Sequence, residues 1–79
     1  MAKRRITLVF SQELIKEPVV FNMAKTCNVI PNIRRARVTE TVGEMTLELE
    51  GTEENLERAA KYLKDHGVKV ESAESMSGL

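Results

Sequence analysis

The stretch from residue 30 to residue 51 predicts a β-hairpin, which restricts the fold more than any other feature of the chain. On both sides of the residue 40–43 segment, apolar and polar residues alternate, as they do in strands with one buried face. A turn at residues 40–43 predicts these cross-strand pairs: Val38 with Met45 and Ala36 with Leu47 on the core side, and Arg37 with Thr46 and Arg35 with Glu48 outside.

One position interrupts the alternation of the hairpin. Ile33 has the opposite parity from Ala36 and Val38, so strict alternation would place it on the other face of the sheet. Either a β-bulge near Arg34 or an outward-facing Ile33 reconciles the pattern. Pro31 has no N–H to donate to a neighbouring strand, so it marks a strand start or an edge position. We therefore expect irregular backbone near residues 32–34.

A strand and a helix are expected before the hairpin. Residues 4–10 alternate, with Ile6, Leu8 and Phe10 on one face, which predicts a half-buried strand. Glu17-Pro18 is a helix start signal, because proline suits the first helical turn. The helix that follows has an apolar stripe at i, i+3, i+4 and i+7, formed by Val20, Met23, Ala24 and Cys27. Asn28, which tolerates the left-handed conformation, is the expected stop.

A second helix and strand follow the hairpin. Thr52 is the expected N-cap, and carboxylates in the next turn suit the positive end of the helix dipole. The apolar stripe repeats at Leu56, Ala59, Ala60 and Leu63, and Gly67 is the expected stop. Val68 and Val70 then predict a short last strand.

The order strand, helix, strand, strand, helix, strand predicts an α+β fold. We expect a ferredoxin-like βαββαβ two-layer sandwich, with a four-stranded antiparallel sheet in the order 4-1-3-2 and both helices on one face. The chain is expected to form one domain over residues 1–79, with its core at about 4–71 and a flexible tail at 72–79. A domain of this size has a marginal core, which favours dimerisation.

Charge and composition exclude several classes of protein. Residues 1–40 hold eight basic and three acidic residues, whereas residues 41–79 hold four and nine, so we expect oppositely charged strands to lie side by side. A single cysteine forms no internal disulfide and holds neither zinc nor an iron-sulfur cluster alone. No apolar run is long enough for membrane insertion, and no signal peptide is present, so a cytoplasmic location is expected.

The ferredoxin-like fold hosts several activities that the sequence argues against. RNA recognition needs aromatic residues on the outer face of the central strands, where this chain is expected to present Thr7, Val9, Thr46, Glu48 and Glu50. Copper chaperones need a cysteine pair after the first strand, and acylphosphatases need an anion-cradling loop with an arginine there. Residues 11–17 contain neither a cysteine pair nor such a loop. Because the expected outer face carries no aromatic residue, no nucleic-acid partner is expected.

Individual reactive residues do not assemble a catalytic site in the sequence. Cys27 lies on the helix stripe, where a buried small hydrophobe is the favoured interpretation. His66 lies at a helix end, which suits a dipole complement or a plain surface residue better than a general base. Arg34, Arg35 and Arg37 suit an anion, although a solvated edge paired with glutamates is favoured. We expect no enzymatic activity, no catalytic residue, no metal and no cofactor.

Several segments together resemble the NIL domain family over about residues 4–71. They are Asn32-Ile33-Arg34-Arg35-Ala36, Phe21-Asn22-Met23-Ala24, Leu47-Glu48-Leu49-Glu50-Gly51, Ala59-Ala60-Lys61-Tyr62-Leu63 and Gly67-Val68-Lys69-Val70-Glu71. The resemblance implies a ferredoxin-like fold related to amino-acid-sensing ACT domains. Members of this family lie in the ATPase subunits of methionine ABC importers and in some small ferredoxins.

The resemblance also implies a ligand site. The Asn and Ile of the family motif fall on Asn32 and Ile33, while Arg34 replaces its Leu. In the transporter branch the domain dimerises and binds methionine near the interface, with the motif Asn in the pocket. The sequence form is more similar to the ferredoxin branch, but it lacks the cysteine run that would hold a cluster.

Two hypotheses follow from the sequence. The first is a non-catalytic regulatory homodimer that binds a small amino acid, methionine or a relative, through Asn32, Ile33 and Arg34. The second is an interaction module without a small ligand, in which the Arg35 and Arg37 edge contacts a ferredoxin, a sulfur-transfer protein or a transporter.

Overall fold

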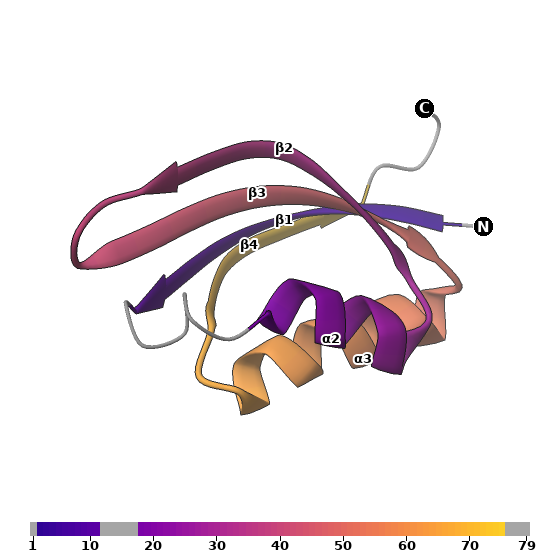
Figure 1. The fold of residues 1–79 in the computed structure, drawn as a ribbon. Coiled ribbons are helices and arrows are strands. Elements are labelled where there is room, and N and C mark those ends of the chain that lie inside the picture. The colour runs from indigo at the N-terminus through magenta and orange to yellow at the C-terminus, as the bar shows by residue number, and fades with distance from the viewer. Residues whose placement is uncertain (1, 12–17, 76–79) are drawn as a thin grey trace.

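The chain folds into one sheet with two helices on one of its faces (Figure 1). The computed structural model describes residues 2–11 and 18–75, with side chains described up to residue 71. Its elements in order are β1 (Ala2–Ser11), α2 (Val19–Cys27), β2 (Ile30–Val38), β3 (Val42–Gly51), α3 (Glu53–Asp65) and β4 (Lys69–Ser75). The element order confirms the predicted ferredoxin-like βαββαβ arrangement.

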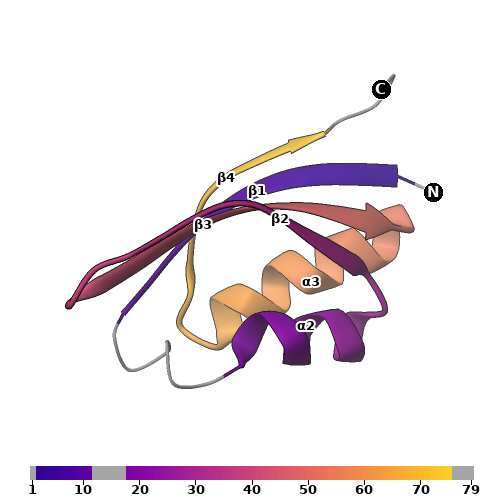
Figure 2. The ribbon, with the colours of Figure 1, turned by 45° about the horizontal axis from the view of Figure 1, so that its top comes forward.

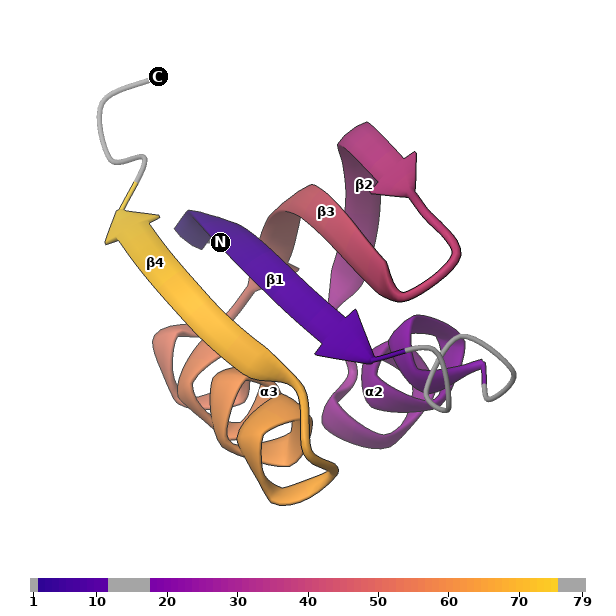
Figure 3. The ribbon, with the colours of Figure 1, turned by 90° about the vertical axis from the view of Figure 1, so that its left-hand side faces the viewer.

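The sheet is antiparallel, in the order β2-β3-β1-β4, which is the predicted order read from the other edge. Figure 2 shows both helices beneath the same face of the sheet, and Figure 3 shows β4 and β2 at opposite sides of the central pair. Among the described residues, the helices cover one face of the sheet and nothing covers the other, which is called the open face; β2 lies at an edge.

The core lies between the helices and the covered face. Alternating residues of the two central strands supply its sheet side, as their period-2 pattern predicts. Helical stripes and two residues outside the elements supply the rest. The buried apolar residues are Ile6, Leu8, Phe10, Val19, Met23, Cys27, Val29, Leu47, Leu49, Leu56, Ala59, Leu63 and Val68.

Both helices end at left-handed residues, as their sequences predict. Asn28 follows α2 with φ 56°, and Gly67 lies just after α3 with φ 84°. The Val68 N–H donates to Leu63 O at 2.9 Å, and the Gly67 N–H donates to Lys64 O at 3.0 Å. This is the Schellman pattern, which supplies partners for the last carbonyls of the helix.

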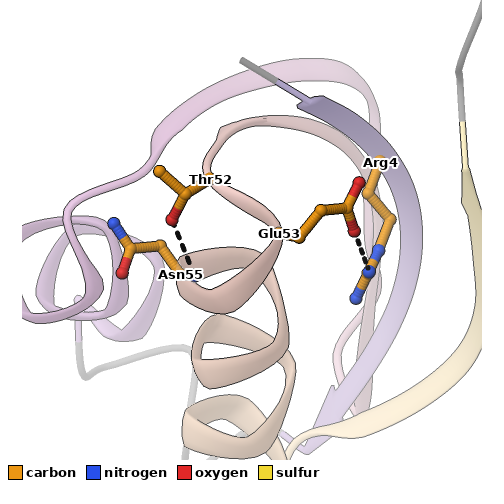
Figure 4. Close-up of polar contacts among 4 residues, drawn as sticks. All are labelled: Arg4, Thr52, Glu53 and Asn55. Carbon is orange, nitrogen blue, oxygen red and sulfur yellow. Dashed lines mark hydrogen bonds and ion pairs between the residues drawn. The ribbon is translucent and has the colours of Figure 1, made fainter.

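The start of α3 joins the helix layer to β1 (Figure 4). Thr52 is the N-cap, and its Oγ1 accepts a hydrogen bond from the Asn55 N–H at 3.1 Å. Arg4 Nη2 lies 3.4 Å from Glu53 Oε2, so an ion pair links β1 to the first turn of α3. The predicted capping residue is confirmed.

The apolar stripe of α2 differs by one residue from the prediction. Val19 is 4% exposed, whereas Val20 and Ala24 are only partly buried against the core. Val19 precedes Met23 by four residues, so the stripe continues one turn earlier on the same face. The helix begins at Val19 with Pro18 as N-cap, and Glu17 and the 12–16 connector lie outside the described residues.

The register of the hairpin differs from the prediction by two residues. Val38 pairs with Gly43 and Ala36 with Met45, whereas the predicted partners were Met45 and Leu47. Thr39 and Val42 close the turn, since the Thr39 N–H donates to Val42 O at 2.8 Å and Thr39 Oγ1 accepts from the Val42 N–H at 3.1 Å. The loop is therefore Glu40-Thr41, and Gly43 belongs to β3.

Gly43 occupies a strand position because of its partner on β1. Phe10 pairs with Gly43, and a Cβ built on that glycine would lie 2.4 Å from Phe10 Cε2. The glycine therefore leaves room for a buried aromatic ring, and it is not a turn residue. Sequence reasoning placed it in the turn because glycine serves both purposes.

The last strand is longer than expected. β4 extends to Ser75, beyond residue 71 where the core was expected to end, and it pairs with β1 as far as Arg4. A register shift where β4 passes Thr7 and Leu8 interrupts the ladder, so a simple alternation does not follow the strand. Residues 76–79 lie outside the described residues.

Candidate functional site

The open face of the sheet carries the polar residues of the central strands. Thr7 pairs with Thr46, Arg5 with Glu48 and Lys3 with Glu50. Because directly paired residues share a face, these six side chains lie opposite the face that buries Leu47 and Leu49. The predicted outer-face residues of the central strands are therefore confirmed, and none of these six is aromatic.

The three predicted ligand residues do not share one face. Asn32 pairs with Glu48 on the open face, whereas Ile33 pairs with Leu47 on the helix-covered face. The register shifts between Ile33 and Arg35, which leaves Arg34 as the extra residue of a β-bulge. The bulge was one of the two predicted alternatives, and it explains why Ile33 shares a face with Ala36 and Val38.

Glu48 links two arginines on the open face. Its Oε2 lies 3.0 Å from Arg5 Nη2, and its Oε1 lies 3.7 Å from Arg34 Nε. The Glu48 side chain is 17% exposed, so this carboxylate is the least solvated of the three groups. Basic β1 and β2 thus lie on either side of acidic β3, as the charge distribution predicted.

A small cleft of about 60 Å³ on the open face has Asn32 among its lining residues. It combines one ammonium group, two carboxylates, one amide and the apolar side chain of Ile30, which is 59% exposed. The lining residues are Lys3, Ile30, Asn32, Glu48, Leu49 and Glu50. These groups offer partners for both charged ends of an amino acid.

The predicted interface arginines lie at the free edge of the sheet. Arg35 pairs with Thr46 and Arg37 with Glu44, so both lie on the open face, and both are exposed. The same strand also exposes Ile30, Ile33 and Val38 by more than half of their surface. An edge strand with exposed apolar and cationic side chains is suited to contact a partner.

The remaining reactive residues occupy structural positions. Cys27 is buried on α2, as predicted for a small hydrophobe. The His66 ring stacks on Tyr62 with centroids 4.0 Å apart, and its Nδ1 lies 2.8 Å from Tyr62 O, which requires Nδ1 to donate. Within the described residues, no group of three or more His, Cys, Asp or Glu side chains is placed to hold a metal ion.

Sequence reasoning did not find which residues lie next to Asn32 and Arg34 on the open face. Lys3, Ile30 and Glu50 line the same cleft as Asn32, and Arg5 lines the same hollow as Arg34. Their outward direction follows from period-2 alternation, but their neighbours depend on the β1–β3 register. That register joins residues about 40 positions apart, and no local pattern specifies it.

Comparisons with known proteins decide the family. The profile of the NIL domain matches residues 4–72, which is nearly the whole chain. The chain belongs to the NIL domain family. Comparison of the sequence with curated proteins gave no significant match.

Two solved structures share the fold of this NIL domain. The C-terminal domain of an ABC transporter ATP-binding protein from Enterococcus faecalis superimposes with a TM-score of 0.76 at 21% identity, over 96% of this chain and 86% of that one. The de novo designed protein Foldit4 gives a TM-score of 0.64 at 12% identity, over 99% and 98%. At these identities the likeness shows the fold alone, and the designed protein illustrates that the fold does not specify a function.

The family and the site together support a regulatory or ligand-binding module. The groups on the open face are hydrogen-bond donors and acceptors suited to binding. Among the described residues, neither helix is long and apolar enough to cross a membrane.

Proposed function

We propose that this NIL domain is a non-catalytic regulatory module that binds a small amino acid, methionine or a related sulfur amino acid, at a dimer interface. The observation that supports this proposal is the cleft around Asn32, which places opposite charges next to an exposed apolar side chain. Lys3 suits the α-carboxylate, Glu50 suits the α-ammonium group, and Ile30 suits the thioether chain. Asn32 can bond to either charged end.

The size of the cleft supports a site completed by a second copy. Its volume of about 60 Å³ is well below the roughly 300–1,000 Å³ of pockets that enclose a drug-sized ligand. The cleft lies beside the free edge of β2, where Ile30 is exposed on the same face as Asn32. A second copy at this edge would cover the ligand and would bury the exposed apolar residues of β2.

Calorimetric titration tests the ligand. Methionine or homocysteine should give saturable heat, and Asn32→Ala should abolish it because the amide is the one described lining group that can bond to both charged ends. Asn22→Ala, on α2 at the other face of the sheet, should leave the heat unchanged. Light scattering should show a dimer whose population rises with the amino acid. An absence of heat with every sulfur amino acid would refute the ligand assignment.

A second function is favoured by the exposed edge of β2. In this alternative, the domain binds a ferredoxin, a sulfur-transfer protein or a transporter through Arg35 and Arg37, with no small ligand. Both arginines are exposed on β2, which is the end strand of the sheet formed by the described residues. Binding to an acidic ferredoxin that survives Asn32→Ala but fails after Arg35→Glu and Arg37→Glu would favour this function over the first.

A further inference from the structure

The open face of the sheet contains a second hollow, separate from the Asn32 cleft. It has a volume of about 430 Å³ and is lined by Arg5, Thr7, Arg34, Arg35 and Thr46. Three guanidinium groups and two hydroxyls thus line one opening, and every one of these groups can donate a hydrogen bond. Among the described residues that line the hollow, none carries a carboxylate.

The bulge at Arg34 assembles this set of side chains. In a regular strand, consecutive residues point to opposite faces, so Arg34 and Arg35 would be separated by the sheet. Here Arg35 pairs with Thr46 on the open face, and Arg34 reaches Glu48 on that same face. The irregularity therefore brings two consecutive arginines to one side.

The register arranges the hollow across three strands. Arg35, Thr46 and Thr7 form one row from β2 through β3 to β1, and both threonines are only partly exposed. Arg5 lies two residues from Thr7 on β1 and on the same face. The two threonine hydroxyls thus line the hollow, with the guanidinium groups beside them.

The charge of the hollow selects the kind of ligand. Among the described side chains, Arg5 and Arg34 share Glu48 as a counter-ion and Arg35 adds a third positive charge, so positive charges outnumber negative ones there. On β4, Glu74 is the backbone partner of Arg5. We propose that this hollow is a binding site for a compact dianion, either a phosphate monoester or a dicarboxylate. Guanidinium forks match the paired oxygens of both groups, and the threonine hydroxyls donate further hydrogen bonds.

Titration of the full 79-residue chain followed by NMR tests the site. Methyl phosphate and succinate, each a dianion at about pH 8, are compared with the monoanion acetate. At low salt, either dianion should saturate shifts of the Thr7 and Thr46 amides and of the Arg34 and Arg35 side-chain N–H signals, and acetate should bind at least several-fold more weakly. The tighter dianion identifies the class of ligand.

Three variants should change the affinity for the dianion in three different ways. Arg35→Ala should weaken binding by about tenfold, because it removes a charge-assisted hydrogen bond. Glu48→Gln should strengthen binding by about threefold, because it releases two guanidinium groups from their counter-ion. Arg37→Ala is the matched control, since Arg37 lies on the same strand and face but does not line the hollow, and it should change the affinity by less than about twofold.

Two results would overturn the proposal. One is the absence of saturable shifts with both dianions, and the other is equal weakening by Arg35→Ala and Arg37→Ala, which would indicate a diffuse positive surface. Asn32→Ala separates this site from the proposed amino-acid site, because that variant should abolish the heat of methionine binding and leave dianion binding intact.

Discussion

The two strands of the hairpin have similar alternating sequences but very different surroundings. In β3, Gly43, Leu47 and Leu49 are buried on one face, with partly buried Met45 between them. In β2, no residue is buried, and Ile33 is 56% exposed although it pairs with Leu47. Figure 1 shows the far end of the hairpin extending beyond both helices.

The difference shows that alternation specifies which residues share a face but not whether that face is covered. β3 lies between two strands, whereas β2 has one neighbour, and the turn end that the two strands share extends past the helix layer. The predicted core positions Ala36 and Val38 are exposed for this reason. Stability should therefore depend on β3, and binding should depend on β2.

The largest predicted effect on stability concerns Leu47, compared with its cross-strand partner Ile33. Leu47→Ala should lower the free energy of unfolding by about 3 kcal/mol, because it opens a cavity at a fully buried position. Ile33→Ala should cost only about 0.5 kcal/mol, because its side chain is already more than half exposed. Urea unfolding measures both. Equal costs would show that β2 is covered in solution.

The next largest effect on stability concerns Gly43 of β3, which pairs with Phe10 of β1. Gly43→Ala should lower the free energy of unfolding by about 2 kcal/mol, since the added methyl group overlaps the buried Phe10 ring. Val42→Ala changes the neighbouring residue, whose side chain is exposed, and should cost about 0.5 kcal/mol or less. Combining Gly43→Ala with Phe10→Leu should cost less than the sum of the single changes. An additive result would exclude the overlap as the cause.

A smaller effect compares two threonines that cap backbone groups. Thr52→Ala should cost about 1 kcal/mol, because it removes the N-cap of a helix that packs on the core. Thr39→Ala should cost about 0.5 kcal/mol, because water replaces its hydrogen bonds to Val42 at the exposed hairpin end. Serine at either position keeps the hydroxyl, so it should retain most of the free energy of unfolding that alanine removes. Urea unfolding measures all four variants. A larger cost at Thr39 would mean that the hairpin end contributes to the cooperative core.

The smallest effect concerns the ion pair between β1 and α3. A double-mutant cycle of Arg4→Ala and Glu53→Ala should give a coupling energy below about 0.5 kcal/mol, because the Glu53 side chain is 70% exposed. The coupling should disappear at high salt. A coupling well above this value would mean that the pair fixes the sheet to the helix layer.

Most of the fold followed from local patterns. The stripes of both helices, the Thr52 cap and the stops at Asn28 and Gly67 are each encoded within a few residues. The predicted position of the hairpin turn was wrong because Gly43 leaves room for the ring of Phe10, a residue more than 30 positions away in the sequence. A residue chosen for a distant neighbour gives a misleading local signal.

The candidate sites were less predictable than the fold. Asn32 and Arg34 were identified from a family motif, and the irregular parity of Ile33 indicated the bulge. Nothing local indicated that Lys3 and Glu50 would lie beside Asn32, or that Thr7 would lie in a row with Thr46 and Arg35. Those neighbours depend on the pairing of three strands.

The sequence by itself determined the element order, the helix ends, the ferredoxin-like topology and the family, because each depends on short-range periodicity, capping or motif residues. Only the tertiary structure decided the strand register, the exposure of β2 and the gathering of arginines and threonines on the open face. These features depend on contacts between distant segments and on where the helix layer ends. Alternation assigns a side chain to a face, and the packing of the whole domain decides what that face meets.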